Sequence, residues 1–148
     1  MIALRAMVVV LIGFILLSDA SADNKKHCTR EEAVQAEDAV DSLNDWDSIY
    51  QVFKRFAHCD DGAISEGYSD AVGRLLADDW AHFRRLSKLC STSKKFRRFV
   101  LKHIDETIPV DVLQKIVDNT RLNCPAGAKE LCKKIEKAAS AGWEPELK

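Results

Sequence analysis

From Thr29 onward, the apolar residues of this chain recur at every third or fourth position and almost nowhere alternate in twos. A spacing of three and four places apolar side chains on one face of an α-helix, whereas alternation in twos is typical of a strand. We therefore predict an all-α fold, a compact bundle of six to seven short helices. Short turns make successive helices antiparallel, either in one bundle or as stacked helical hairpins.

Local signals place the ends of these helices. Thr29 and Glu32 form a capping box, in which each side chain bonds to the backbone of the other residue. We predict a turn at Asp61-Gly62, because glycine accepts a positive φ at little cost. Pro109 suits the first turn of a helix. We expect helices over about 30–42, 45–57, 63–76, 79–89, 94–104 and 108–122, and a last one that begins within 125–129 and ends near Gly142.

Two features of the pattern indicate how the helices pack. The expected helix 45–57 carries the most aromatic face in the chain, so we place the centre of the core there. Gly67 and Gly73 lie inside the expected helix 63–76, where each glycine costs about 1 kcal/mol relative to alanine. We therefore expect another helix or a partner to approach the backbone closely at these two positions.

The first residues have the features of a secretory signal peptide. Residues 1–22 carry one basic side chain, Arg5, then an unbroken apolar run over 8–17, and end in the small-residue motif Ala20-Ser21-Ala22. The run is too short for a permanent membrane span. We predict cleavage near Ala22, a single helical domain over 23–142 and a flexible C-terminal tail over 143–148. The expected location is secreted or periplasmic, without stable membrane anchoring.

All five cysteines lie in the part predicted to be exported, where disulfides can persist. In an antiparallel hairpin, the start of the first helix and the end of the second lie at the same end, so we predict a Cys28–Cys59 bridge. Cys124 can pair with Cys132 if residues 125–128 form a turn, or with Cys90 at the end of the fourth helix. We favour Cys124–Cys132, with Cys90 as the free thiol.

Charge is unevenly distributed along the chain, although the formal net charge is only −1. Residues 23–79 hold fourteen acidic against six basic residues, whereas residues 80–102 hold eight basic residues and no acidic one. The acidic candidates for partner binding around the expected turn are Asp60, Asp61, Glu66 and Asp70. The basic patch comprises Arg84, Arg85, Lys94, Lys95, Arg97 and Arg98. Such polarity steers encounters with partners, but it also fits solvated faces of opposite sign.

The chain offers no arrangement that is typical of catalysis. Glycine-rich phosphate loops, G-x-S-x-G and H-E-x-x-H motifs are missing from it. His58 and Cys59 are sequence neighbours and would point apart on a helix, while His82 and His103 have no evident acidic partner. The two His-Cys pairs match no zinc module, so we favour the disulfide over zinc. We predict no enzyme activity, no cofactor and no metal site.

These observations favour an exported helical protein that binds another protein, with the acidic residues as its recognition edge. In kind, as a small disulfide-containing helical domain with a polarised surface, the chain resembles periplasmic immunity or inhibitor proteins that neutralise cell-wall-targeting toxins. A carrier that encloses an apolar ligand between helices is an alternative, as is a purely structural role. Homo-oligomers could form through the acidic and basic faces, and we expect no nucleic acid as a partner.

Overall fold

The computed structural model describes residues 26–142, and in this range the chain is helical and contains no strand. The α-helices are α1 (Arg30–Val40), α2 (Trp46–Phe56), α3 (Gly62–Asp78), α4 (Phe83–Thr92), α5 (Lys94–Lys102), α6 (Val110–Leu122) and α7 (Lys129–Ala141). Two short 3₁₀ helices, η1 (Ala57–Cys59) and η2 (Trp80–His82), precede α3 and α4. The predicted all-α fold is confirmed. The predicted signal peptide and tail lie outside the described residues.

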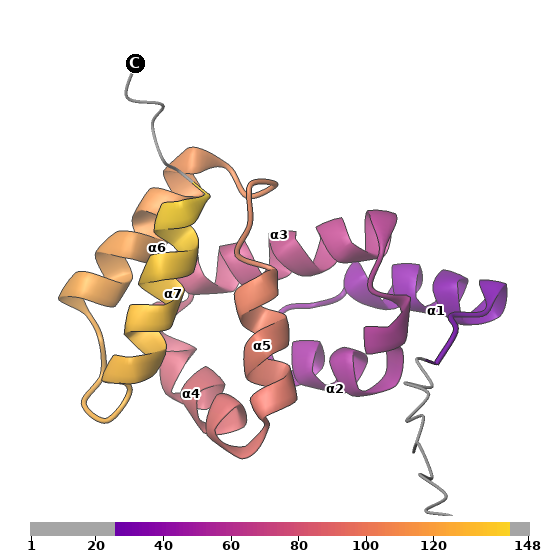
Figure 1. Cartoon of the computed structure of the whole chain (residues 1–148), viewed down its shortest axis with the longest axis horizontal. Coiled ribbons are helices and arrows are strands. Elements are labelled where there is room, and N and C mark those ends of the chain that lie inside the picture. Colours follow the sequence, from indigo (N-terminus) through magenta and orange to yellow (C-terminus); the bar gives the residue numbers. More distant parts are fainter. Residues whose placement is uncertain (1–25, 143–148) are drawn as a thin grey trace, which may run out of the picture.

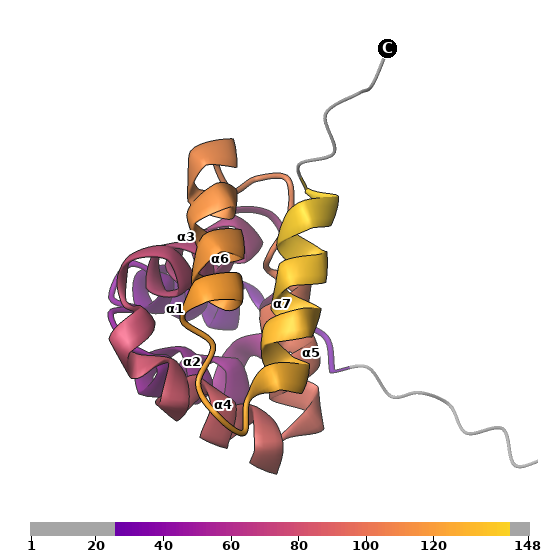
Figure 2. The same ribbon diagram turned by 90° about the vertical axis from the view of Figure 1, so that its left-hand side faces the viewer.

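Helix α3 connects the two ends of the molecule. The hairpin of α1 and α2 lies at one end, and α6 and α7 lie side by side at the other (Figure 1). The view turned by 90° shows the same pairing of α6 with α7 (Figure 2). Because α3 contacts both α1 and α6, it joins the N-terminal hairpin to the C-terminal helix pair in one framework.

The helix starts follow the local signals, with differences of a few residues. Thr29 and Glu32 form the expected capping box, Asp45 forms one with Ser48, and the Ser93 hydroxyl accepts a hydrogen bond from the backbone N–H of Phe96. The predicted start of the fourth helix is too early, because residues 80–82 wind as 3₁₀ helix and α4 begins only at Phe83 and extends to Thr92. Proline 109 stands just before α6 rather than in its first turn.

The aromatic face of α2 packs against α5, with Tyr50 and Phe53 partly buried at the edge of the core rather than at its centre. The Phe53 ring lies 5.2 Å from the Phe96 ring and 4.8 Å from the Phe99 ring, measured between centroids. Phe99 in turn lies 4.8 Å from Tyr68 of α3 and 4.4 Å from the imidazole of His103. The predicted aromatic face therefore forms one wall of the core, and the end of α5 brings a histidine into it.

The two glycines in the interior of α3, Gly67 and Gly73, permit close packing, as predicted, although the neighbour of Gly73 is a connecting segment rather than a helix. A Cβ atom added at Gly67 would lie 2.8 Å from Cγ2 of Val40 in α1. One added at Gly73 would lie 3.0 Å from Cδ1 of Ile108, which precedes α6. The absence of side chains at these positions lets α3 contact the N-terminal hairpin and the α5–α6 connection directly.

Two disulfides fasten the fold. Cys28 is bonded to Cys59 with their Cα atoms 4.9 Å apart, and Cys124 is bonded to Cys132. The second bridge is possible because residues 125–128 form a turn, with Gly127 at φ +85°. Cys90 is free and buried. No helix among residues 26–142 combines the length and the apolar character needed to cross a membrane.

Candidate functional site

The acidic stretch that the sequence singles out divides into three environments. Cys59 and Asp60 connect α2 to α3 and pack inward, Asp61 caps the start of α3, and Glu66 and Asp70 lie on its exposed surface. The predicted set of partner-binding carboxylates is therefore not a single surface.

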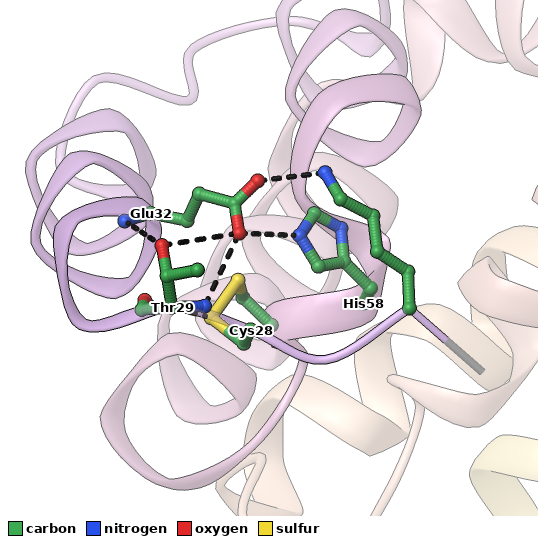
Figure 3. Close-up of a disulfide and its surroundings, with 6 residues drawn as sticks. Cys28, Thr29, Glu32 and His58 are labelled. Atoms are coloured by element: carbon green, nitrogen blue, oxygen red, sulfur yellow. Dashed lines mark hydrogen bonds and ion pairs between the residues drawn. A yellow bond between two sulfur atoms is a disulfide. The ribbon is translucent and has the colours of Figure 1, made fainter.

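At the N-terminal corner, the Glu32 carboxylate collects hydrogen bonds beside the Cys28–Cys59 disulfide (Figure 3). It accepts from Lys26 Nζ at 2.6 Å and from the backbone N–H of Thr29 at 3.1 Å, and His58 Nε2 lies 3.2 Å away. The hydrogen bond from Lys26, then that from Thr29 and the nearby His58 ring, lower the pKa of Glu32 from 4.5 to about 2. The carboxylate therefore stays ionised and ties the first residues of α1 to η1.

Asp60 turns away from solvent toward the end of α5. Its Oδ2 accepts from Lys102 Nζ at 2.7 Å and lies 3.2 Å from His103 Nε2, and the Asp60 side chain is only 9% exposed. Burial favours the protonated carboxyl, but the hydrogen bonds from His103 and then Lys102 outweigh it and hold the pKa of Asp60 well below its ordinary value. Asp60 is therefore an internal anion, which removes it from the predicted recognition edge.

His103 is completely buried and bridges two carboxylates. Its Nδ1 lies 3.1 Å from Ser69 Oγ, and the Ser69 hydroxyl donates to Asp105 Oδ2 at 2.9 Å. Burial raises the pKa of Asp105, but bonds from Thr107 and Ser69 together lower it below its ordinary value, so the carboxylate can only accept. His103 Nδ1 therefore faces the Ser69 hydroxyl, and Nε2 faces the Asp60 carboxylate. The ring links the η1–α3 connection to α3, and through Ser69 to Asp105.

This network superficially has the members of a serine–histidine–aspartate triad, but its geometry differs from one. In a hydrolytic triad, the serine is exposed and gives its proton to the histidine. Here Ser69 is 1% exposed and gives its proton to a carboxylate. The Ser69 hydroxyl thus has no route to a substrate in this structure, and the network ties α3 to the α5–α6 connection.

The sequence reasoning missed this network. It left His103 without an acidic partner, which is wrong, because Asp60 lies beside it. It also left His82 unpartnered, whereas His82 Nδ1 lies 2.6 Å from Asp79 Oδ1. The second contact was detectable from its spacing of three residues. The first spans 43 residues, and no local signal could have revealed it.

Glu66 and Asp70 line a groove of about 500 Å³ between α3 and the start of α6. We call this the α3–α6 groove; its lining comprises Glu66, Asp70, Gly73, Arg74, Asp78, Thr107, Ile108, Pro109 and Val112. The carboxylates of Glu66, Asp70 and Asp78 are exposed along one side, while Ile108 is buried beneath. The groove therefore combines an acidic rim with an apolar floor.

Arg74 also lines the groove and keeps its positive charge, but among the described residues it forms no ion pair with Asp70 or Asp78 within 4.0 Å. Its Nη2 donates to the backbone carbonyl of Leu43 at 2.6 Å. Asp78 has a long contact with Lys115 Nζ, 3.4 Å, between two exposed side chains. Exposed pairs of this kind contribute little to stability. Three carboxylates against one guanidinium leave the lining of the groove net negative.

The predicted basic patch is spread over α4 and α5. Arg85 is paired with Asp47 of α2 through a forked hydrogen bond. Among the described residues, the other members of the patch form no ion pair within 4.0 Å. Arg97 is half-buried and lines a small hollow whose wall includes Cys90, while the remaining members are exposed.

Comparison with known proteins leaves the chain without an assigned relative: no family model, no curated protein and no solved structure matches it. Its candidate sites therefore have to be judged from their own geometry.

Proposed function

We propose that this protein is an exported binding protein, and that its α3–α6 groove receives a basic segment of another protein. The observation that carries the proposal is the pairing of exposed carboxylates with an apolar floor in one groove. A groove of this size lies within the range of ordinary ligand sites. The two disulfides support export, because such bonds persist in oxidising compartments.

The rim suits a cationic segment because its charges recur along one side of a helix. Glu66, Asp70 and Asp78 are four and eight residues apart, so their Cα atoms lie about 6 and 12 Å apart along the axis. Lysine or arginine side chains on an extended or helical segment can reach such a row. An apolar side chain between them would cover Ile108 and Val112, and this would select against purely polar cations.

The carrier alternative has less support. It requires an apolar cavity closed off from water, whereas the hollow of about 880 Å³ at the N-terminal corner is open and lined by charged groups such as Lys26, Glu37 and Asp61. We therefore base the proposed function on the α3–α6 groove and assign no reaction to the protein.

Fluorescence anisotropy with a labelled peptide of alternating lysine and leucine tests the groove. We expect saturable binding that weakens with added salt, and at least about tenfold weaker binding by the E66Q/D70N double variant. The matched control, E37Q/D38N, removes two exposed charges from α1 instead and should bind as the unmodified protein does. Equal losses in both double variants would show that only net charge matters and would contradict the proposal.

A sedimentation measurement identifies the source of the basic segment. We expect a monomer, because the proposed partner is a different protein. A dimer that dissociates in E66Q/D70N would instead make a second copy of this chain the occupant, through its own basic patch.

A further inference from the structure

Beside the first disulfide, three side chains of metal-binding type converge. Ligand atoms of Glu32, His58 and Cys59 all lie within 4.8 Å of one another, and the sulfur of Cys28 is bonded to that of Cys59. Figure 3 shows the Glu32 carboxylate and the His58 ring pointing toward each other beside the disulfide. Thiolate, imidazole and carboxylate are the three ligand types that Zn²⁺ takes in proteins.

His58 is the most informative member of this set. Its side chain is 12% exposed, and Nε2 is buried without a well-directed hydrogen bond, although Glu32 Oε2 lies 3.2 Å from it. A buried ring nitrogen normally has a partner. In the disulfide form, this nitrogen faces the Glu32 carboxylate, which already accepts hydrogen bonds from Lys26 and Thr29.

The backbone already holds the four residues at a suitable separation. Cys28 and Glu32 flank the start of α1, His58 and Cys59 form the end of η1, and the two cysteine Cα atoms are 4.9 Å apart. Two sulfurs bound to one zinc at about 2.3 Å each lie about 3.7 Å apart in tetrahedral geometry. Side-chain rotation can produce that separation without moving α1 away from η1.

We propose that the reduced form of this corner binds one Zn²⁺ through Cys28, Cys59, His58 and Glu32. The disulfide in the oxidised form and the zinc ion in the reduced form would then each link the start of α1 to η1. A dithiol reductant supplies two electrons and two protons to the Cys28–Cys59 bond and itself becomes a disulfide. Zinc binding then displaces the two thiol protons into solvent. His58 binds through Nε2, and Glu32 shifts from Lys26 to the metal.

The neighbouring hollow gives the metal a route to the site. It has a volume of about 880 Å³ and is lined by residues that include Lys26, Cys28, His58 and Cys59. The side chain of Lys26 is 63% exposed, so its ammonium can move into solvent when Glu32 changes partner. The oxidised chain lacks both thiolates and should bind zinc at least about a hundredfold more weakly.

Cobalt binding provides the test, because the absorption spectrum of bound Co²⁺ depends on the type and geometry of its ligands. The protein is treated with a phosphine reductant and titrated with Co²⁺ and then Zn²⁺, while the oxidised protein is titrated in parallel. We expect one equivalent of tetrahedral Co²⁺ with a sulfur-to-cobalt charge-transfer band in the reduced protein only, displaced by one equivalent of Zn²⁺. H58Q should weaken binding at least about tenfold, and C28S/C59S should abolish the band.

Two controls keep the outcome decisive. H82Q removes an exposed histidine that pairs with Asp79 and should bind cobalt as the unmodified protein does. Circular dichroism verifies that each reduced variant is folded. Octahedral cobalt spectra, a band that persists in C28S/C59S, or equal affinity in H58Q and H82Q would each overturn the proposed site.

Discussion

The carboxylate of Asp60 and the imidazole of His103 lie 3.2 Å apart, although 43 residues separate them in sequence. Asp60 belongs to the connection between η1 and α3, whereas His103 directly follows α5. Their contact joins the disulfide-linked corner to the second half of the chain. Through this contact, the acidic stretch 60–70 contributes one of its charges to the interior.

Replacing Asp60 with asparagine should destabilise the fold. The substitution leaves the buried His103 without its anion, and hydrogen bonds to charged groups contribute about 1.5–3 kcal/mol each. We expect a loss of about 2 kcal/mol in the free energy of unfolding, measured by urea denaturation. Asp38→Asn removes an exposed carboxylate of α1 and should change stability by less than about 0.5 kcal/mol. Equal effects would show that Asp60 is not an internal partner.

Acid should weaken the N-terminal corner through Glu32. The folded-state pKa of about 2 lies below the ordinary 4.5, so the unfolded chain binds the proton first as the pH falls. The stabilisation by Glu32 is therefore fully present above about pH 4.5 and is lost as the pH falls through 2. Urea midpoints of the unmodified protein and E32Q should differ at pH 6 and converge toward pH 2. A constant difference across this range would contradict the shift.

Alanine at Gly67 should destabilise the contact between α1 and α3. The new methyl group would lie 2.8 Å from Cγ2 of Val40, a stiff β-branched side chain. Overpacking of this kind costs about 1–3 kcal/mol, which exceeds the gain of about 1 kcal/mol in helix propensity. Melting temperatures should show that G67A lowers stability and that V40A partly restores it in the double variant. Purely additive effects would exclude a direct clash.

The thiol of Cys90 should be unreactive while the protein is folded. Burial raises its pKa to about 12, and its side chain is almost fully enclosed. At pH 8, the thiolate fraction is then on the order of one in ten thousand. Iodoacetamide labelling followed by mass spectrometry should detect modification only in denaturant. Rapid labelling of the native protein would place Cys90 at the surface.

Much of the fold was predictable because its signals are local. The capping box of Thr29 and Glu32, which spans four residues, sets the start of α1. The turn at Asp61-Gly62, with Gly62 at φ +49°, sets the start of α3. The first disulfide also followed from local information, because a helical hairpin brings its two ends together whatever the rest of the chain does. Periodicity sets helix faces, so the aromatic wall of α2 was predictable as well.

The candidate site was predictable only in part. Glu66 and Asp70 lie on regular helix, where spacing shows that they share a face. Asp60 lies in a non-helical connection, and periodicity does not determine the direction of its side chain. Its pairing with His103 depends on how α5 packs against α3, which is a property of the assembled core.

The two disulfides enclose segments that do not overlap: 28–59 and 124–132. In a chain that emerges with its N-terminus first, Cys28 and Cys59 are the only thiols present until Cys90 appears. The native first bridge then has no competitor. Oxidation during N-terminus-first emergence would therefore favour the native Cys28–Cys59 pair. Refolding of the full-length denatured chain, in which all five thiols are present at once, would not give this advantage.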